Sequence, residues 1–454
     1  MERIRLYQKC LTKNKELSFP LRQIDLSSAD VQEATSWCVL APVLHTFVIW
    51  TLQQALAKKV ERLYFLSRDG YLMFKTAEKI VEQLKLPIVC HYLYCSRYSM
   101  RTPLFHLDMD ETRDYICRNS IRINLETILK RTGLKRAKRV EIIQELAWDG
   151  SSKEEIPYAG LKEVRTRLHK SKLFNKYVTE NSKRLLPALE SYLRQEGLLD
   201  GGNYAIVDSG WTGSTQKTLN QALAYFGVKE KVRGYYFGLY TLPPKEDQKE
   251  YHAYYFYPDQ NLKEKIYFSN SLFEAIFSAP HGMTLGYHFF EGKSKPFFLP
   301  LDEDSLLFSK KTEQIMLQYT KLLLDGTNRL MELNTLAIKN TVYKLLKLFM
   351  ANPTKEEVTC FGNILFCDDV FEDAKQPIAV RLTEAELANH KLGPKIMMML
   401  GLRRGKIKES GWHEGSVRKH HKYREYLKQY AAYKGLLYLR TAVRWKLAKW
   451  VKIH

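Results

Sequence analysis

The chain has 454 residues, of which 45% are hydrophobic, and a formal net charge of +21. This length and composition allow a sizeable core in two or three domains. The 7 cysteines include no Cys-x-x-Cys pair, and their odd number argues against a disulfide framework or a zinc site and favours reduced thiols.

The N-terminal part offers no segment suited to secretion or to spanning a membrane. The first residues, Met1 to Arg5, lack the apolar stretch of a secretion signal, so we expect a cytoplasmic protein. The longest apolar segment, Trp37 to Leu52, is interrupted by Pro42 and His45 and is shorter than the ~20 residues that cross a bilayer. We therefore predict a core helix there, packed on a sheet.

A strand, a polar turn and a helix come next. Residues 62–66 are apolar enough for a buried strand, Ser67-Arg68-Asp69-Gly70 has the composition of a tight turn, and residues 71–84 carry apolar side chains at helical spacing. A second short strand, residues 88–94, ends in Cys95-Ser96-Arg97. Strands separated by helices predict an α/β fold with a mainly parallel sheet, whose ligand sites lie beyond the carboxyl ends of the strands.

A helical insertion is predicted over residues 104–195. Helical apolar spacing recurs in residues 110–130, 139–146 and 171–195, between breaks that contain glycine or proline. The insertion separates a first half of the α/β core, residues 1–103, from a second half, residues 196–300. Its position between two polar turns is suited to covering a site and shaping a substrate pocket.

The second half of the core begins with the most informative segment of the chain. An apolar run, residues 204–207, ends at Asp208, and the loop Ser209-Gly210-Trp211-Thr212-Gly213-Ser214-Thr215 leads into a predicted helix over residues 216–226. The unpaired N–H groups and the dipole at the start of a helix attract a phosphate. The glycines of the loop let the backbone approach a ligand, and its hydroxyls add donors. Two such turns predict one site for two phosphate groups; the alternative is a pair of ordinary turns, with Asp69 as a helix cap.

The remaining elements complete the core and add a helical region. Strands are predicted at residues 232–239 and 251–257, and the segment from Phe273 to Gly282 contains Glu274 and His281, which either face the site or form a buried charge pair. Residues 301–400 form a helical region, with helices over residues 305–324 and 329–350.

The tail, residues 401–454, is strongly basic. It holds 15 Lys or Arg and 3 Glu, a balance of +12 out of the formal +21. From Leu436 onward, one helical face carries Leu439, Val443, Leu447 and Trp450. A basic amphipathic helix suits an anionic membrane surface, each cation contributing ~1 kcal/mol near anionic lipid. We predict a peripheral position at the inner face of the cell membrane; the alternative is a solvated helix packed on the protein.

The two polar turns resemble the loops of type I phosphoribosyltransferases. Asp208 and the residues Thr212, Gly213 and Thr215 have the spacing of the second acid and the Thr-Gly-x-Thr of that family's phosphoribosyl-diphosphate loop, and the Ser67 to Gly70 turn resembles its pyrophosphate loop. Val207 replaces the first of the family's two adjacent acids, and the stretch between the loops is longer than in nucleobase-salvage members. These departures argue against a nucleobase acceptor.

A narrower resemblance extends over residues 35–290. The Ala41-Pro42 helix and the segments 63–70, 207–215 and 273–282 are similar to proteins of bacterial polysaccharide gene clusters, often labelled predicted hydrolases of the haloacid-dehalogenase superfamily. The resemblance implies transfer of 5-phosphoribose from phosphoribosyl diphosphate to a sugar hydroxyl of a capsule or O-antigen glycan, as a source of ribofuranose. It also implies a separate phosphatase as a partner and a glycan, or lipid-linked glycan, as the acceptor.

This activity gives each predicted site residue a role. Arg68, with Ser67 and Gly70, would stabilise the departing pyrophosphate, and residues 209–215 would hold the 5-phosphate. Asp208 would bind the ribose hydroxyls or Mg²⁺, the expected cofactor. Asp69 is the first candidate for the general base and Glu274 the second. Arg97 and His281 would contact substrate.

Other functions stay open at this point. A haloacid-dehalogenase-like phosphatase needs an aspartate two residues before a second one, whereas Ser67 precedes Asp69 in this way. A non-catalytic membrane-surface scaffold of a polysaccharide assembly system is compatible with Val207, and a nucleotide-sugar glycosyltransferase is the weaker choice. Nucleic acid is a poor partner, because the chain contains no nucleic-acid-binding motif.

Overall fold

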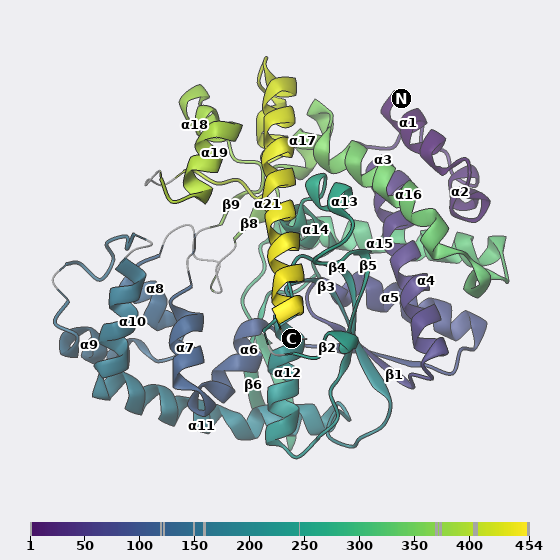
Figure 1. Ribbon diagram of the computed structural model, residues 1–454. Coiled ribbons are helices and arrows are strands. Elements are labelled where there is room, and N and C mark those ends of the chain that lie inside the picture. The colour runs from purple at the N-terminus through teal and green to yellow at the C-terminus, as the bar shows by residue number, and fades with distance from the viewer. Residues whose placement is uncertain are drawn as a thin grey trace.

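A five-stranded parallel sheet with the strand order β2-β1-β3-β4-β5 forms the centre of the computed structural model (Figure 1). The structure describes residues 2–118, 120, 123–148, 150–157, 160–244, 246–367, 371, 375–402 and 407–451, the side chains only as far as residue 447. The strands are β1 (Arg62–Leu66), β2 (Val89–Leu93), β3 (Tyr204–Trp211), β4 (Arg233–Leu239) and β5 (Tyr251–Phe256). The α/β class, the parallel sheet and its five strands are therefore confirmed, although β3 continues four residues past the predicted end at Val207.

Alternating side chains give this sheet two apolar faces. Phe65 and Val207 lie in one core, and Tyr64 and Ile206 lie in the other, as the period of two along a strand requires. Connections between parallel strands are long enough to be helical. The helix after β1, α5 (Gly70–Leu84), packs on the first face, and the helix after β3, α12 (Ser214–Tyr225), packs on the second.

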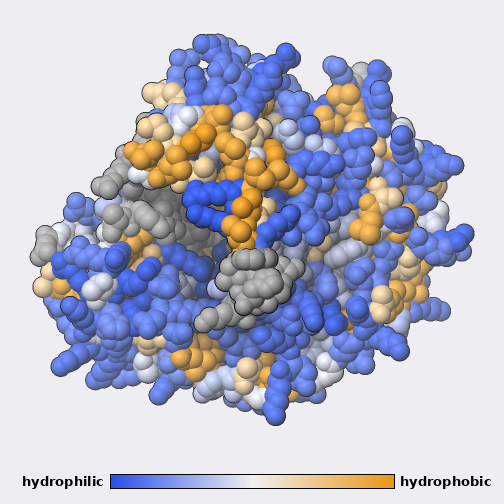
Figure 2. All heavy atoms as spheres, viewed as in Figure 1, coloured by the Kyte–Doolittle hydropathy of each residue, from blue (hydrophilic) through white to orange (hydrophobic). Residues whose placement is uncertain are grey.

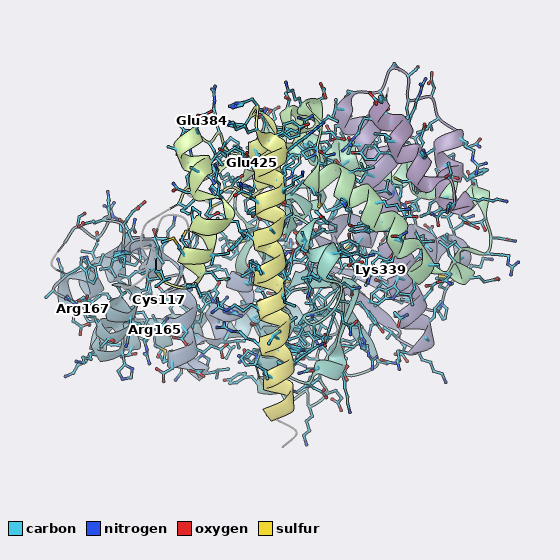
Figure 3. The ribbon with its side chains drawn as sticks, turned by 45° about the horizontal axis from the view of Figure 1, so that its top comes forward. Cys117, Arg165, Arg167, Lys339, Glu384 and Glu425 are labelled. Atoms are coloured by element: carbon cyan, nitrogen blue, oxygen red, sulfur yellow. The ribbon has the colours of Figure 1, made fainter. Side chains whose placement is uncertain are left out.

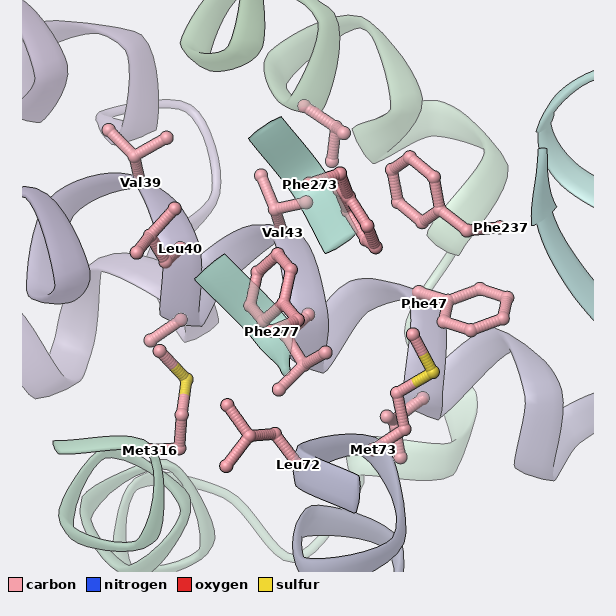
Figure 4. Packing of buried hydrophobic residues seen from close by; sticks show 14 of the residues in the cluster. Val39, Leu40, Val43, Phe47, Leu72, Met73, Phe237, Phe273, Phe277 and Met316 are labelled. Atoms are coloured by element: carbon pink, nitrogen blue, oxygen red, sulfur yellow. The ribbon is translucent and has the colours of Figure 1, made fainter. Parts of the chain in front are cut away.

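The first face carries the largest core. Figure 4 shows Val43 and Phe47 of α4 (Ala41–Ala57), Phe273 of α14 (Asn270–Phe277) and Met316 of α15 (Glu303–Gly326) converging there. The same core includes side chains of α1 (Glu2–Leu11), α2 (Lys15–Arg22) and α16 (Thr335–Leu346). The region predicted as a separate unit, residues 301–400, thus shares its core with the N-terminal helices. Its helices have an apolar face that must be buried against other elements.

The long apolar segment is a core helix, as predicted. The helix α3 (Val31–Thr35) continues through the π-helical turn η1 (Ser36–Leu40) into α4, and the Phe47 ring lies 5.6 Å from that of Phe237 on β4. In the described part of the chain, Val31–Ala57 is the one helix long and apolar enough to cross a membrane, but its apolar window is entirely buried inside the molecule.

The second face is covered by the long helix α11 (Lys172–Gln195), by α12 and by an antiparallel hairpin, β6 (Thr284–Phe290) with β7 (Lys293–Phe298). The hairpin was not predicted. Two short helices, α6 (Arg97–Arg101) and η2 (Thr102–Leu107), lead from β2 into the insertion.

The helical insertion has a core of its own, which the first half of α11 shares. Its helices are α7 (Met109–Ile116), α8 (Leu125–Lys130), α9 (Arg136–Glu145) and α10 (Leu161–Lys170). The single helix predicted over residues 110–130 is wrong. The buried guanidinium of Arg131 donates to the carbonyls of Ile116 and Arg118 at the end of α7, and Asn124 caps α8, so both backbone ends are satisfied by side chains.

The C-terminal part consists of shorter elements. The helix predicted over residues 329–350 is interrupted, since Asn334 caps α16 and the turns η5 (Leu330–Glu332) and η6 (Lys347–Ala351) flank it. After it come α17 (Lys355–Phe361), β8 (Leu365–Phe366), β9 (Gln376–Pro377), α18 (Glu384–Asn389), α19 (Leu392–Met399) and α20 (His413–Arg418); a further short turn, η4 (Gln248–Glu250), precedes β5, and α13 (Leu262–Ile266) follows it.

The last helix, α21 (Tyr423–Val451), runs across the front of the molecule in Figure 1. The predicted apolar positions from Leu436 onward, as far as the side chains are described, do share one face of this helix, and that face is exposed. Tyr438 and Trp445 pack inward on the protein, and Leu439, Val443 and Leu447 are exposed on the opposite side. The predicted face member Trp450 lies outside the described side chains.

Candidate functional site

The two polar turns meet at one end of the sheet. Both line a cavity of about 520 Å³: the first contributes Ser67, Arg68 and Asp69, and the second contributes Asp208 to Thr212, Ser214 and Thr215. The strands β1 and β3 are neighbours, but the chain leaves β1 toward β2 on one side and leaves β3 toward β4 on the other. Crevices of this kind, at the carboxyl ends of strands where the winding reverses, are the usual ligand sites of open α/β sheets.

A direct hydrogen bond joins the two turns, which lie 140 residues apart in the chain: the hydroxyl of the buried Ser209 donates to the Asp69 carboxylate. Asp69 precedes α5 but makes no side-chain bond to its first turn, so the helix-cap interpretation is wrong. Burial raises the pKa of the Asp69 carboxyl, and the bond from Ser209 opposes that rise.

Three carboxyl groups from different elements face one another in the cavity. Burial raises the pKa of Asp208 to about 8, and the nearby Asp69 and Glu274 raise it further. Burial also raises the pKa of Glu274 to about 7, with an added contribution from Asp69. The guanidinium of Arg97 lowers all three pKa values, though less than burial raises them. Perturbed carboxyl groups in a cleft are typical of functional sites.

Trp211 positions Glu274. Trp211 lines the cavity, and its ring is packed among Phe256, Phe268 and Phe273. Its indole N–H donates to the Glu274 carboxylate. Glu274 and His281 do not form the charge pair considered from the sequence, because both ring nitrogens of His281 bond to Tyr92 and Gly282 instead.

The second turn follows the path that its glycines permit. Gly210 has φ +111°, and a Cβ there would lie 2.4 Å from the Gly238 carbonyl oxygen of β4. Gly213 has φ +61°, and a Cβ would lie 2.6 Å from the Tyr251 ring. Side chains are excluded at both positions, so the turn can pass close to β4 and β5 before α12 begins.

The start of α12 faces the cavity. Ser214 and Thr215, the first residues of this 12-residue helix, line it together with the exposed Thr212, whose hydroxyl donates to that of Ser214 over 3.2 Å. The first amide groups of a helix have no partner within the helix and point outward. This end of the cavity therefore presents N–H groups, hydroxyls and a positive helix end to a ligand, which suits a phosphate.

The first turn adds a cation and a fixed backbone. The Ser67 hydroxyl donates to the Cys95 carbonyl and accepts from the Cys95 N–H, over 2.6 and 2.9 Å, so it ties the ends of β1 and β2 together. Arg68 follows it, through a cis peptide, and lines the cavity. Arg97 lies on the same side, at the start of α6, where Ser96 forms a capping box.

Some predicted residues lie outside this cavity. Gly70 is packed against the backbone of Phe65, where a Cβ would lie 3.1 Å from its carbonyl carbon. His281 bonds to the Tyr92 hydroxyl and to the Gly282 carbonyl, each over 2.8 Å, and does not line the cavity. The prediction that it contacts substrate there is therefore not supported by its position.

Val207, which precedes Asp208 where the resemblance predicts the first of two adjacent acids, is fully buried in the core of the first face. A carboxylate at this position would lose its hydration among apolar side chains. Asp69, from the turn between β1 and α5, and Glu274, from α14, instead bring the additional carboxyl groups to Asp208.

Other cavity residues were missed by sequence reasoning because they come from distant elements. The insertion supplies Tyr115, Arg118 and Arg131 to one wall. Phe308, the segment Ile364–Cys367 and Lys375 also line the cavity. A buried arginine in a helical stretch and a short strand far downstream have no sequence signal that would assign them to this site.

The donor set fits a hard cation such as Mg²⁺. Carboxylate oxygens are the ligands that Mg²⁺ prefers. After burial, the neighbouring carboxyl groups add to the raised pKa of Asp208 and of Glu274, and a cation would balance that negative charge. A second possible metal group, Glu384 with His420 and His421, has ligand atoms within 4.8 Å of one another but lies away from the cavity. Its imidazoles suit transition metals rather than Mg²⁺.

Comparisons of this chain with family models and with curated proteins find no match. The resemblance to phosphoribosyltransferases therefore depends on the residues of the two turns and on their meeting in one cavity.

Proposed function

We propose that the protein is a phosphoribosyltransferase that moves 5-phosphoribose from phosphoribosyl diphosphate to a sugar hydroxyl of a bacterial glycan. The observation that carries the proposal is that two anion-binding turns, one on each of two adjacent parallel strands, line a single cavity with three carboxyl groups between them. A sugar with phosphate groups at both ends matches this arrangement, in which each turn offers hydrogen-bond donors and the carboxyl groups lie between the turns.

The donor has one orientation that satisfies both turns. Its 5-phosphate would lie at the start of α12, against the N–H groups and hydroxyls of Ser214 and Thr215. Its pyrophosphate would lie at the first turn, against Arg68 and Arg97, which stabilise the charge that develops on the leaving group. The ribose between them would bring its hydroxyls to Asp208.

Breaking the bond between ribose C1 and pyrophosphate leaves positive charge on the ring. Asp208, held beneath the ring and next to two further carboxyls, would stabilise that charge. Mg²⁺, held by Asp208 with one of its carboxyl neighbours, would neutralise charge on the pyrophosphate.

Glu274 fits the role of general base better than Asp69. A base works best when its pKa lies near the operating pH, and the pKa of Glu274 is raised to about 7. The Trp211 N–H fixes the orientation of this carboxylate. Asp69 is engaged by the Ser209 hydroxyl, so we assign it to holding the two turns together.

The walls of the cavity support an acceptor larger than a nucleobase. The insertion contributes Arg118 and Arg131 on one side, and Phe308 and Phe366 lie on the other. A glycan terminus bearing hydroxyls can combine contacts to such polar and apolar surfaces. Phosphatase chemistry is disfavoured, because the position of a nucleophilic carboxylate holds Ser67, whose hydroxyl is bonded to the Cys95 backbone.

Binding of donor fragments tests the assignment of the turns. Calorimetry with Mg²⁺ should show that Arg68→Gln weakens binding of pyrophosphate but not of ribose 5-phosphate, and that Thr215→Val does the reverse. Asp325→Asn, an exposed carboxyl on α15, is the matched control.

Release of pyrophosphate tests the reaction itself. The full chain, Mg²⁺ and a glycan acceptor should release pyrophosphate from phosphoribosyl diphosphate, and Glu274→Gln should reduce kcat by about 10²–10⁴-fold, the usual contribution of a general base. Binding of phosphoribosyl diphosphate with no turnover on any glycan acceptor would support the scaffold alternative. Binding of a nucleotide sugar without binding of phosphoribosyl diphosphate would overturn the proposal.

A further inference from the structure

The helix α21 presents an unpartnered apolar stripe on the side facing away from the protein. Its inner side is anchored by Lys434, whose ammonium group donates to the Phe268 carbonyl and pairs with Glu414, both partners being buried. The outer side exposes Leu436, Leu439, Val443 and Leu447, of which the last three are at least half exposed. These positions recur at three- and four-residue intervals, so they share one face of the helix.

The stripe continues onto a neighbouring element. Helix α19 lies beside α21 in both Figure 1 and Figure 3, and the Arg440 guanidinium of α21 donates to the Met399 carbonyl at the end of α19. Leu400 and Leu402, just past that end, are 59% and 72% exposed. Figure 2 shows apolar side chains gathered over these two helices. Contiguous exposed apolar surface of this kind marks an interaction site.

Cations flank the stripe. Arg444 and Lys446 are exposed on α21, on either side of the apolar positions, and Arg440 lies between the two helices. The tail as a whole has 15 Lys or Arg against 3 Glu. A second copy of the chain would bring the same positive charge against itself, whereas an anionic lipid surface offers the opposite charge and an apolar interior for the leucines.

The stripe lies near the candidate site. On the inner side of α21, the Tyr438 ring stacks on that of Tyr240, 5.1 Å away, and the Tyr240 N–H donates to the carbonyl of Trp211 in the second turn over 2.8 Å. One helix thus contacts the edge of the cavity region with one side and exposes leucines with the other.

We propose that the outer face of α21 and the end of α19 form a docking surface for an anionic phospholipid bilayer. The leucines enter the boundary between headgroups and acyl chains, and Arg444 and Lys446 contact lipid phosphates. Docking holds the carboxyl edge of the sheet close to the membrane. The surface is separate from the cavity, so this inference does not depend on the proposed chemistry.

Vesicle co-sedimentation of the full chain tests the surface. The protein should bind vesicles of phosphatidylcholine containing one third phosphatidylglycerol, and bind vesicles of phosphatidylcholine alone much more weakly. The double change Leu439→Asp with Val443→Asp should reduce vesicle binding on the order of thirtyfold. The two apolar side chains, each about half exposed in the free protein, are then no longer present to bury that exposed surface in the bilayer. Arg444→Gln with Lys446→Gln should reduce binding about twenty-five-fold, at roughly fivefold per cation. Added salt should also weaken binding.

The control is Leu336→Asp, because Leu336 is 65% exposed on α16, away from the stripe. It should bind like the parent protein, and unchanged melting temperatures would show that all variants fold. Absence of vesicle binding by the parent, equal binding to both vesicle types, or full binding by the stripe variant overturns the proposal. A parent dimer that the stripe variant converts to a monomer also overturns it, in favour of a second copy. The stripe variants retain the cavity, so they should bind phosphoribosyl diphosphate like the parent. Vesicle binding therefore tests the membrane proposal, and donor binding tests the phosphoribosyltransferase proposal.

Discussion

Replacing Asp208 by asparagine should stabilise the metal-free protein while it abolishes donor binding. The change keeps the size of the side chain but removes a negative charge that lies in the cavity with Asp69 and Glu274. In the folded state, burial and these neighbours raise the pKa of Asp208 from 3.8 to about 8. An ionised carboxylate at this position therefore lowers the stability of the folded protein, and a neutral asparagine does not have this cost.

The size of the effect follows from linkage. A pKa difference of this size corresponds to on the order of 5 kcal/mol at pH 8, and we expect about half of that, since the carboxyl faces a cavity that water enters. The sign is fixed: the folded state binds the proton more tightly than the unfolded state. Stability from this group is therefore complete below about pH 4, the pKa of the unfolded chain, and is lost as the pH rises toward 8.

Thermal unfolding in a chelator, from pH 5 to pH 8, measures this effect. At roughly 1 °C per kcal/mol for a chain of this length, Asp208→Asn should melt about 2–3 °C above the parent at pH 8 and by less at pH 5. Asp325→Asn, on the surface of α15, should track the parent at every pH. A lower melting temperature for Asp208→Asn at pH 8, or a difference that shrinks as the pH rises, would refute the reasoning.

Three further outcomes are expected. Trp211→Phe keeps an aromatic ring but removes the N–H that donates to Glu274, so the pKa of that carboxyl should rise. The acidic limb of the pH profile of kcat/KM should move up by about one pH unit, at roughly 1.4 kcal/mol for a lost bond to a charged group; a limb that moves down contradicts this. Gly210→Ala should destabilise the protein by about 2–4 kcal/mol in denaturant unfolding, because its Cβ would meet the Gly238 carbonyl at 2.4 Å and φ is +111°; an unchanged midpoint would show that the turn relaxes. The melting temperature of the parent should fall less between pH 5 and pH 8 when Mg²⁺ is present, and Mg²⁺ should have a smaller effect on Asp208→Asn. Equal effects of Mg²⁺ on both proteins would show that the cation binds elsewhere.

The two strands that carry the polar turns could be predicted from the sequence because their signals are local. Apolar runs of strand length that end in polar, glycine-containing turns identify β1 and β3, and the following amphipathic spacing identifies α5 and α12. Helix ends were less predictable. The break between α7 and α8 depends on the buried Arg131 guanidinium, which binds the carbonyl groups of residues 116 and 118, and no periodicity reveals such a cap.

Within the site, too, some features could be predicted from the sequence and others could not. That a polar, hydroxyl-rich turn follows Asp208 and leads into a helix could be predicted from residue type and spacing, since these residues are contiguous in the chain. The residue types did not show that the Trp211 ring would turn into the core and give its N–H to Glu274, 63 residues later. Nor did they show that His281 would bond to Tyr92 outside the cavity.

The sequence by itself determined the parallel α/β core, the two polar turns and the basic tail, because each follows from residue type and short-range spacing. Tertiary structure alone decided that Ser209 bonds Asp69 across 140 residues, that three carboxyls converge, and that the tail exposes one apolar side while it packs with the other. Such contacts depend on which strand pairs with which and on which face of a helix finds a partner. Those choices are made by the packing of the whole chain, and no local pattern records them.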